Sequence, residues 1–184
     1  MKTILNRIRH FFLDFIQTVV IALSIFVILY LFLVQPHQVK GNSMNPNFLD
    51  QEYILTDKIG YRFHDPQRED VIIFTSPQDP DYEYIKRIIG LPGETIKIER
   101  GEVFINGQKL AEAYLPASFQ TLSGHFLKEG QTYTISEGQY FVFGDNRNHS
   151  SDSREWGPVE REKIIGRAWF RYWPLSKVGL VSKR

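Results

Sequence analysis

The feature that most constrains this chain is an apolar run of twenty residues, Phe15 to Val34, near its N-terminus. Three clearly polar side chains interrupt it: Gln17, Thr18 and Ser24. As an α-helix, a run of this length crosses the hydrocarbon core of a bilayer, which is about 30 Å thick. We therefore predict a transmembrane anchor over residues 11–34, preceded by a short basic segment at residues 1–10.

Two other interpretations fit the run less well. A cleavable secretory signal has a shorter apolar region and a small-x-small cleavage site, whereas this run ends Leu33-Val34-Gln35-Pro36. A core helix of a soluble protein carries a polar face, which this run lacks. Three basic residues precede the run and only Lys40 follows it closely. The positive-inside rule then predicts a cytoplasmic N-terminus and an extracytoplasmic domain at residues 35–184, at the plasma membrane.

Composition excludes several classes of function for this domain. The chain has 22 Lys and Arg and 21 Asp and Glu, and removing the three basic and one acidic residues of its first 14 positions leaves 19 and 20. A near-neutral domain without a basic stripe is not expected to bind nucleic acid, which requires clustered positive charge. Cysteine is absent, which excludes disulfides, thiolate metal ligands and cysteine nucleophiles. We expect one monomeric globular domain without a cofactor.

After Pro36 the sequence changes to short runs of β-branched and aromatic residues separated by turn residues, a pattern typical of antiparallel sheet. Arg100-Gly101 and Asn106-Gly107 predict tight hairpin turns. We predict a mainly β domain, with a coiled antiparallel sheet that closes like a barrel or packs as two sheets. The predicted strands are Glu52–Asp57, Asp70–Phe74, Tyr82–Ile89, Thr95–Glu99, Glu102–Ile105, Thr132–Ile135, Tyr140–Phe143 and Ile164–Tyr172.

A candidate nucleophile, Ser43, stands in the segment Gly41-Asn42-Ser43-Met44-Asn45-Pro46 just after the apolar run. Glycine and proline favour a chain reversal here, and asparagine tolerates unusual backbone angles. From the local sequence alone, an ordinary turn serine is the simpler interpretation. A nucleophilic serine also needs a base, an oxyanion site and a rigid scaffold.

Lys86 is a candidate base, in the segment Tyr84-Ile85-Lys86-Arg87-Ile88-Ile89-Gly90-Leu91-Pro92-Gly93-Glu94. Strand alternation places Tyr84, Lys86 and Ile88 on one face. Burial beside these neighbours disfavours the ammonium and lowers the lysine pKa, so that the neutral amine becomes available. The alternative is a lysine whose ammonium reaches solvent at the sheet edge and stays charged.

A polar loop, Gly144 to Arg154, contains no aliphatic side chain over eleven residues. Its acidic and basic side chains can form ion pairs that order it. His149 allows a competing triad of Ser43, His149 and Asp152. A metal site formed by Asp145, His149 and Asp152 is a further alternative, although no firm ligand spacing supports it.

Four blocks follow the predicted anchor in order: Gly41-Asn42-Ser43-Met44-Asn45-Pro46, Arg68-Glu69-Asp70-Val71-Ile72-Ile73-Phe74, the Tyr84 to Glu94 segment, and Gly144-Asp145-Asn146-Arg147 with Ser150-Ser151-Asp152-Ser153-Arg154. In this combination the chain resembles bacterial type I signal peptidase over most of its length. That family consists of Ser/Lys-dyad endopeptidases that remove signal peptides from exported preproteins after small-x-small sites, at the outer face of the plasma membrane.

The resemblance implies that Ser43 is the nucleophile and Lys86 its general base. Ser150 matches a serine whose hydroxyl hydrogen-bonds the lysine amine and orients it. Gly41 stands where relatives with a larger insertion carry a serine that donates to the oxyanion. Glycine has no hydroxyl, so the oxyanion site of this chain would depend on the N–H of Ser43.

The resemblance also implies supporting and substrate-binding roles. Asp152 and Arg154 match residues that hold the polar loop, and Arg87 would form a supporting ion pair with Asp145. Glu69 replaces a residue that is usually glycine and is expected to fit a turn without consequence. Five residues fall where the family lines its pockets for small side chains at the first and third positions before the cut: Val39, Met44, Phe48, Tyr84 and Ile85.

We therefore interpret the chain as a membrane-bound serine endopeptidase acting on exported preproteins. An extended substrate would add a strand beside the one that contains Lys86. A Ser/Lys self-cleaving repressor would be soluble and carry a DNA-binding domain, and a non-catalytic binder of exported chains would not require Ser43, Lys86 and Ser150 together. Ala111-Glu112-Ala113 fits the small-x-small preference, so self-cleavage before Tyr114 is an additional hypothesis.

Overall fold

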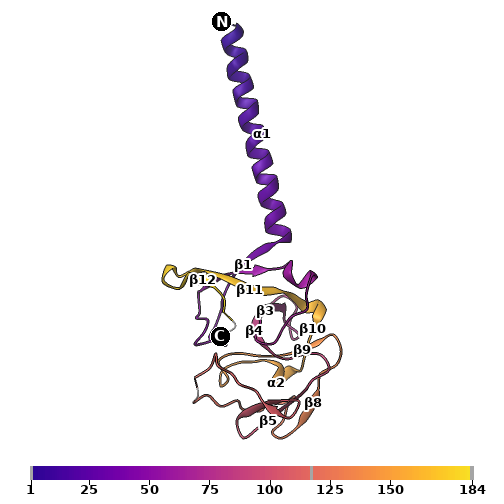
Figure 1. Cartoon of the computed structure of the whole chain (residues 1–184). Coiled ribbons are helices and arrows are strands. Elements are labelled where there is room, and N and C mark those ends of the chain that lie inside the picture. Colours follow the sequence, from indigo (N-terminus) through magenta and orange to yellow (C-terminus); the bar gives the residue numbers. More distant parts are fainter. Residues whose placement is uncertain (1, 117, 183–184) are drawn as a thin grey trace.

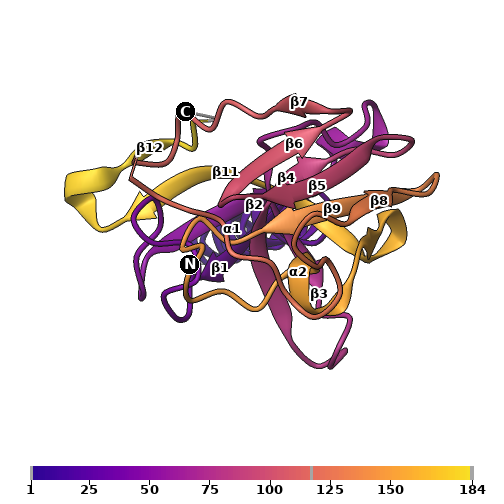
Figure 2. The ribbon, with the colours of Figure 1, turned by 90° about the horizontal axis from the view of Figure 1, so that it is seen from below.

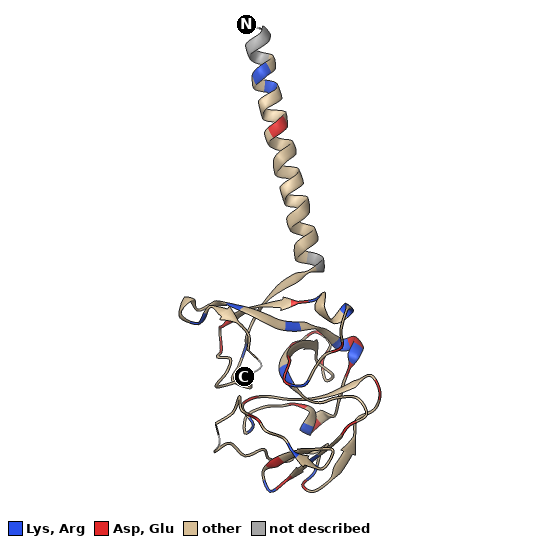
Figure 3. Ribbon diagram, viewed as in Figure 1, with Lys and Arg blue, Asp and Glu red and all other residues tan. Residues whose placement is uncertain are grey.

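The computed structural model describes residues 2–116 and 118–182, as a long N-terminal helix followed by a β domain (Figure 1). Helix α1 spans Lys2–Phe32, and its segment Asn6–Tyr30 is long and apolar enough to cross a membrane. This segment is not buried against the β domain, from which the helix projects. Figure 3 shows that the charged residues described on this helix lie in its N-terminal half. A core helix would be covered by protein, so the soluble-core interpretation does not fit.

The helix ends at Phe32, before the predicted end of the anchor at Val34. After one intervening residue, strand β1 begins, which spans Val34–Gln38. It pairs antiparallel with β2, Tyr53–Asp57. Pro36 accounts for this difference, because proline disfavours helical geometry in the residue before it and is tolerated on an edge strand. The apolar helix therefore continues almost directly into the sheet.

Two antiparallel sheets form the β domain (Figures 1 and 2). Besides β1 and β2, the larger sheet contains β3 Val71–Thr75, β4 Glu83–Gly90, β9 Gln139–Phe143, β10 Val159–Glu160, β11 Ile164–Trp173 and β12 Gly179–Leu180. Its order is β1-β2-β11-β3-β4-β9-β10, with β12 paired to β11. The smaller sheet, in the order β7-β6-β5-β8, contains β5 Thr95–Glu99, β6 Glu102–Ile105, β7 Gln108–Lys109 and β8 Thr132–Thr134.

The prediction of a mainly β domain is confirmed, and all eight predicted strands are present, with each end at the predicted residue or one residue away. Strands β1, β7, β10 and β12 were not predicted. The last three contain two residues each, too few to show alternation. Neither sheet closes within the described residues, so the arrangement is two sheets and not a barrel. Four short helical segments complete the fold: α2 Ser153–Trp156, η1 Gly60–Arg62, η2 Arg161–Lys163 and η3 Leu175–Lys177.

Three buried apolar clusters hold the sheets together. The first packs the smaller sheet against β9 and includes Ile96, Ile98, Phe141 and Phe143. The second covers one face of the larger sheet around Ile72 and Ile88. The third supports the loop after β1, and its buried members are Val39, Met44, Phe48, Ile54, Val71, Ile73 and Ala168. Full burial of one such side chain contributes about 1.5–3 kcal/mol, so this cluster fixes the loop firmly on the sheet.

Candidate active site

Ser43 and Lys86 meet beside the larger sheet, although 43 positions separate them in the sequence. Ser43 lies in the loop that follows β1, and Lys86 lies on β4. Lys86 Nζ is 2.7 Å from Ser43 Oγ, and it also donates to the carbonyl oxygen of Ile85 at 3.0 Å. This contact is suited to transfer of a proton from the serine hydroxyl to a neutral lysine amine.

The environment of Lys86 favours that neutral form. The residue is only 4% exposed. Burial lowers the pKa of Lys86 from its ordinary 10.5 to about 8, although the nearby carboxylates of Asp152 and Asp145 act in the opposite direction and Arg154 adds to the lowering. At this pKa about a tenth of the lysines are neutral at pH 7. Lys86 therefore does not behave as a solvent-exposed cation.

The polar loop Gly144–Arg154 holds the main chain of Asn42 and Ser43. The N–H of Asn146 donates to the carbonyl oxygen of Ser43 at 3.0 Å, and the Asn146 side chain donates to the carbonyl oxygen of Asn42 at 3.0 Å. A Cβ on Gly144 would lie 2.4 Å from the carbonyl oxygen of Ser43 and 2.2 Å from Ser150 Oγ. Glycine is thus required where the two loops meet.

Ser150 lies at this junction but does not make the predicted hydrogen bond to Lys86. Its Oγ is buried, and no described residue serves as its hydrogen-bond partner. The contacts of the lysine amine go to Ser43 and Ile85. Ser150 therefore lies where the polar loop meets the loop that contains Ser43. Its hydroxyl is buried there without a hydrogen-bond partner among the described residues.

Arg87 and Asp145 form the expected ion pair behind the dyad. The guanidinium donates twice to the carboxylate, at 2.8 and 2.6 Å, and both side chains are 1% exposed. Arg87 also donates to the carbonyl oxygen of Glu69 at 3.0 Å and stacks 4.1 Å above the Tyr114 ring. Because this pair is bidentate and buried, it fixes β4 to the start of the polar loop.

Asp152 and Arg154 order the other end of the loop. Asp152 caps the N-terminus of α2, accepts from the N–H of Gly144 at 2.9 Å and pairs with Arg154 through both carboxylate oxygens. Arg154 donates further to the carbonyl oxygens of Arg147 at 2.8 Å and Leu122 at 3.0 Å. These bonds satisfy buried charges that would otherwise destabilise the loop.

Arg147 is a loop-holding residue that the sequence analysis did not identify. It is 2% exposed and pairs with Glu112, and it donates to the hydroxyl of Thr121. Its position inside the polar loop could have indicated this role, because an arginine that becomes buried there needs an acidic partner. The same contacts hold the segment around Ala113, in which Ala111 and Ala113 are exposed and Tyr114 is only 5% exposed. Self-cleavage before Tyr114 stays a prediction.

His149 is exposed. Among the described residues, its side chain makes no hydrogen bond or ion pair with Ser43 or Asp152. The triad interpretation therefore lacks its central hydrogen bonds. The metal interpretation is also unsupported, because Asp145 is paired with Arg87 and Asp152 with Arg154. Over residues 2–116 and 118–182, no group of three His, Asp or Glu side chains is arranged to hold a metal ion.

A groove of about 830 Å³ leads to the dyad. One wall is formed by β1 and the two residues after it, from Gln35 to Lys40, and the other by Pro80 to Lys86, which lead into and begin β4. Its apolar lining consists of Val39, Ile54, Ile73, Tyr84 and Ile85. Met44 and Phe48, also predicted to bind substrate, are instead buried in the cluster that supports the groove, and neither lines it.

His37 and Glu83 join the two walls of the groove, a contact that sequence reasoning missed. His37 Nε2 on β1 lies 2.9 Å from Glu83 Oε2 on β4, and His37 Nδ1 lies 2.7 Å from Thr56 Oγ1. No sequence pattern signals this pairing, because it depends on how far the sheet curls.

The two positions at which the sequence departs from the family that it resembles, Gly41 and Glu69, both have left-handed backbone angles. Gly41 has φ +82°, and its N–H donates to Asp50 at 2.8 Å, so the position suits glycine better than serine. Glu69, expected to be without consequence, has φ +70°, a conformation that costs a non-glycine residue about 1–2 kcal/mol. The N–H of Ser43 donates to no described residue, which leaves it available to an oxyanion.

Comparison with known proteins gives consistent matches. A model of the family described as signal peptidase, peptidase S26, matches residues 12–173, which include Ser43, Lys86 and the polar loop. Probable signal peptidase I-2 of Synechocystis sp. is 36% identical over 172 residues, covering 90% of this chain and 75% of that protein. Signal peptidase IB of Staphylococcus aureus is 31% identical over 176 residues, covering 90% and 91%. The crystal structure of a signal peptidase I from Enterococcus faecalis V583 is 34% identical, with a TM-score of 0.46, covering 56% of this chain and 97% of that one.

Proposed function

The chain belongs to the signal peptidase family, peptidase S26, and we propose that Ser43 is its nucleophile and Lys86 its general base. It is a peptidase that cleaves signal peptides, and its substrates are preproteins that carry them. The observation that carries the assignment of the dyad is the 2.7 Å contact between Ser43 Oγ and the buried Lys86 amine, at the end of an apolar groove.

The reaction proceeds by acyl transfer. The neutral amine of Lys86 accepts the hydroxyl proton as Ser43 Oγ attacks the scissile carbonyl carbon. The N–H of Ser43 donates to the oxyanion that forms. Collapse of this intermediate breaks the peptide bond, and the Lys86 ammonium returns the proton to the leaving amine. Water, deprotonated by Lys86, then attacks the acyl carbon and releases Ser43.

The open edge of β4 supports binding of the substrate as an added strand. Glu83–Arg87 pair with β3 on one side, whereas β9 pairs with β4 only from Arg87 onward. On the β3 side, the carbonyl oxygen of Tyr82 and the N–H of Ile88 make hydrogen bonds. Alternation along an antiparallel strand then directs the main-chain groups of Glu83 and Ile85 to the other side, where a peptide can pair with them.

The apolar lining of the groove supports a preference for small side chains. Val39 and Ile85 lie above the packed Met44 and Phe48, so these walls have little freedom to move apart. A close-packed wall accommodates an added methylene poorly, which costs about 1–3 kcal/mol. Alanine and glycine before the cut therefore fit best.

We further propose that α1 anchors the enzyme in the plasma membrane, with residues 1–10 in the cytoplasm and residues 35–184 outside. The apolar run Phe15 to Val34 and the three basic residues before it, Lys2, Arg7 and Arg9, support this orientation. Protease added to intact spheroplasts should digest the domain after Pro36, and protection of the whole domain would contradict the orientation.

The dyad is tested by a time course of preprotein cleavage with the purified full-length protein. Ser43→Ala and Lys86→Met should each abolish the mature product. The matched controls Ser123→Ala and Lys97→Met change an exposed serine and a lysine of the smaller sheet, and both should retain wild-type rates. Equal cleavage by Ser43→Ala and the wild type would refute the proposed nucleophile.

A further inference from the structure

Strand β11 contains two irregularities on either side of Phe170 and Arg171. Its pairing with β2 shifts register between Ala168 and Phe170, and again between Arg171 and Trp173. Bulges of this kind re-aim a side chain relative to a regular strand. Here they direct Arg171 to the loop that carries the nucleophile.

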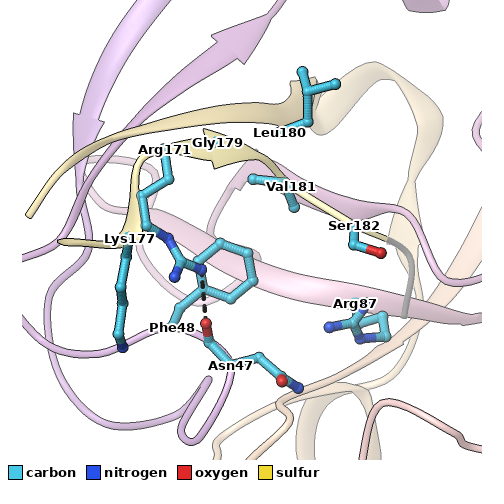
Figure 4. Close-up of a pocket in the computed structure, with 9 residues that line it drawn as sticks. All are labelled: Asn47, Phe48, Arg87, Arg171, Lys177, Gly179, Leu180, Val181 and Ser182. Atoms are coloured by element: carbon cyan, nitrogen blue, oxygen red, sulfur yellow. Dashed lines mark hydrogen bonds between the residues drawn. The ribbon is translucent and has the colours of Figure 1, made fainter. Parts of the chain in front are cut away.

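Arg171 makes three contacts with this loop. Its Nη2 donates to the carbonyl oxygen of Asn47 at 2.7 Å, and its Cζ lies 4.8 Å above the Phe48 ring (Figure 4). Its Nε lies 3.1 Å from Glu52 Oε2. The arginine side chain is 16% exposed. One rigid guanidinium therefore binds a main-chain oxygen, a buried ring and a carboxylate of the same loop.

Asn47 connects this contact to the dyad. Its side chain donates to Asp145 Oδ2 at 2.8 Å and to the carbonyl oxygen of Tyr114 at 2.9 Å. Asp145 in turn holds Arg87, the residue after the base Lys86. The loop after Ser43 is thus fixed from β11 on one side and from the polar loop on the other.

We propose that Arg171 is a positioning residue that sets the place of Ser43 relative to Lys86. It acts through Asn47, Phe48 and Glu52, none of which lines the substrate groove. The inference rests on the proposed Ser43/Lys86 function. It predicts an effect on the chemical step and not on substrate binding.

A pocket beside Arg171 makes this role testable by chemical rescue. The pocket has a volume of about 180 Å³ and is lined by Asn47, Phe48, Arg87, Arg171, Lys177 and Gly179–Ser182 (Figure 4). Truncation of Arg171 would enlarge it where the guanidinium now lies. Lys177 Nζ also contacts Glu52, at 3.0 Å, so this buried carboxylate keeps a partner in the variant.

The experiment measures kcat per active site and KM for preprotein cleavage, with Arg171→Ala and the same-strand control Arg167→Ala. Because small misplacement of a nucleophile is costly, Arg171→Ala should lower kcat about tenfold with KM within about twofold of wild type. Millimolar methylguanidinium should restore much of this loss. Arg167→Ala should keep wild-type kcat and show no rescue.

An unchanged kcat in Arg171→Ala, a rise confined to KM, or a loss that methylguanidinium does not reverse would overturn the proposal. If Arg171→Ala does not fold, Arg171→Lys decides, because it keeps the charge beside Glu52 but cannot make all three contacts. A wild-type kcat in Arg171→Lys would then refute the positioning role. Absence of cleavage by the wild type would refute the proposed function itself, so the two failures are distinguishable.

Discussion

His37 and Glu83 lie 2.9 Å apart across the substrate groove, although β2, β11 and β3 separate their strands within the sheet. The curl of the larger sheet brings its edge strand β1 back towards β4. The pair is therefore a contact between the two walls of the groove, and it sets their spacing.

Loss of this wall-to-wall contact should affect substrate binding more than chemistry. His37→Ala and Glu83→Gln should each change KM by about two- to fivefold, since a partly exposed ion pair is worth about 0.2–1 kcal/mol. The value of kcat should stay close to wild type because the dyad remains in place. In a double-mutant cycle the two effects should not add, and additive effects would show that the residues act independently.

The identity of the base predicts a specific pH profile. Lys86→Met should abolish cleavage, whereas His149→Ala should retain most activity because His149 is exposed. In the wild type the rate should rise with pH through about 8 and then level off, because only the neutral Lys86 amine accepts the Ser43 proton. Activity in Lys86→Met together with its loss in His149→Ala would restore the histidine triad.

The buried Lys86 should also reduce the stability of the fold. The unfolded chain holds the Lys86 proton up to its ordinary pKa of 10.5 and the folded chain only to about 8, so the free energy of unfolding rises with pH in this window. Lys86→Met should therefore raise it by up to about 3 kcal/mol at pH 7, and this gain should shrink above pH 8 and be lost near pH 10.5.

Urea titration of both proteins in detergent at several pH values measures this difference. Lys97→Met, which removes a lysine paired with Glu99 in the smaller sheet, serves as the control. A stabilisation of Lys86→Met that did not vary between pH 7 and pH 10 would contradict the lowered pKa.

The close contact between the loop of Ser43 and the polar loop Gly144–Arg154 predicts that one added methyl group will strongly reduce activity. In Gly144→Ala the new Cβ would meet the carbonyl oxygen of Ser43 at 2.4 Å and Ser150 Oγ at 2.2 Å. Because the carbonyl oxygen belongs to the main chain, Ser43 must move to make room. The rate of cleavage should therefore fall by about 100-fold or more. Gly179→Ala is the control, because nothing lies within 4 Å of its Cβ. Equal activities would show that the loops can separate without consequence.

Sequence periodicity predicted the long strands because alternation is a local property. The register between β1 and β2 and the two-residue strands could not be predicted, because they depend on pairing between distant segments. Pro36 in particular argued against a strand by local rules, yet it lies on the edge strand, where its missing N–H is tolerated.

For the site, too, local sequence patterns were informative, whereas contacts between distant segments could not be predicted. Lys86 could be identified as partly buried from alternation on β4, and polar residues of the loop Gly144–Arg154 required partners. The burial of Met44 and Phe48 in the cluster that supports the groove, and the lack of a hydrogen bond between Ser150 and the lysine amine, follow from packing between loops. No pattern within one segment contains that information.

The open edge of β4 has a consequence for self-association. An unpaired strand edge beside apolar side chains is also a template for the strand of another copy, which is a common route to aggregation. In this protein the stretch of β4 without a partner strand on its second side is short, from Glu83 to Lys86, and both of its ends carry an ionisable side chain. A partner strand must also be narrow enough to enter between the two walls of the groove. An extended chain with small side chains meets this condition. The features of the groove that suit an extended peptide with small side chains are therefore unfavourable for the strand of a second copy.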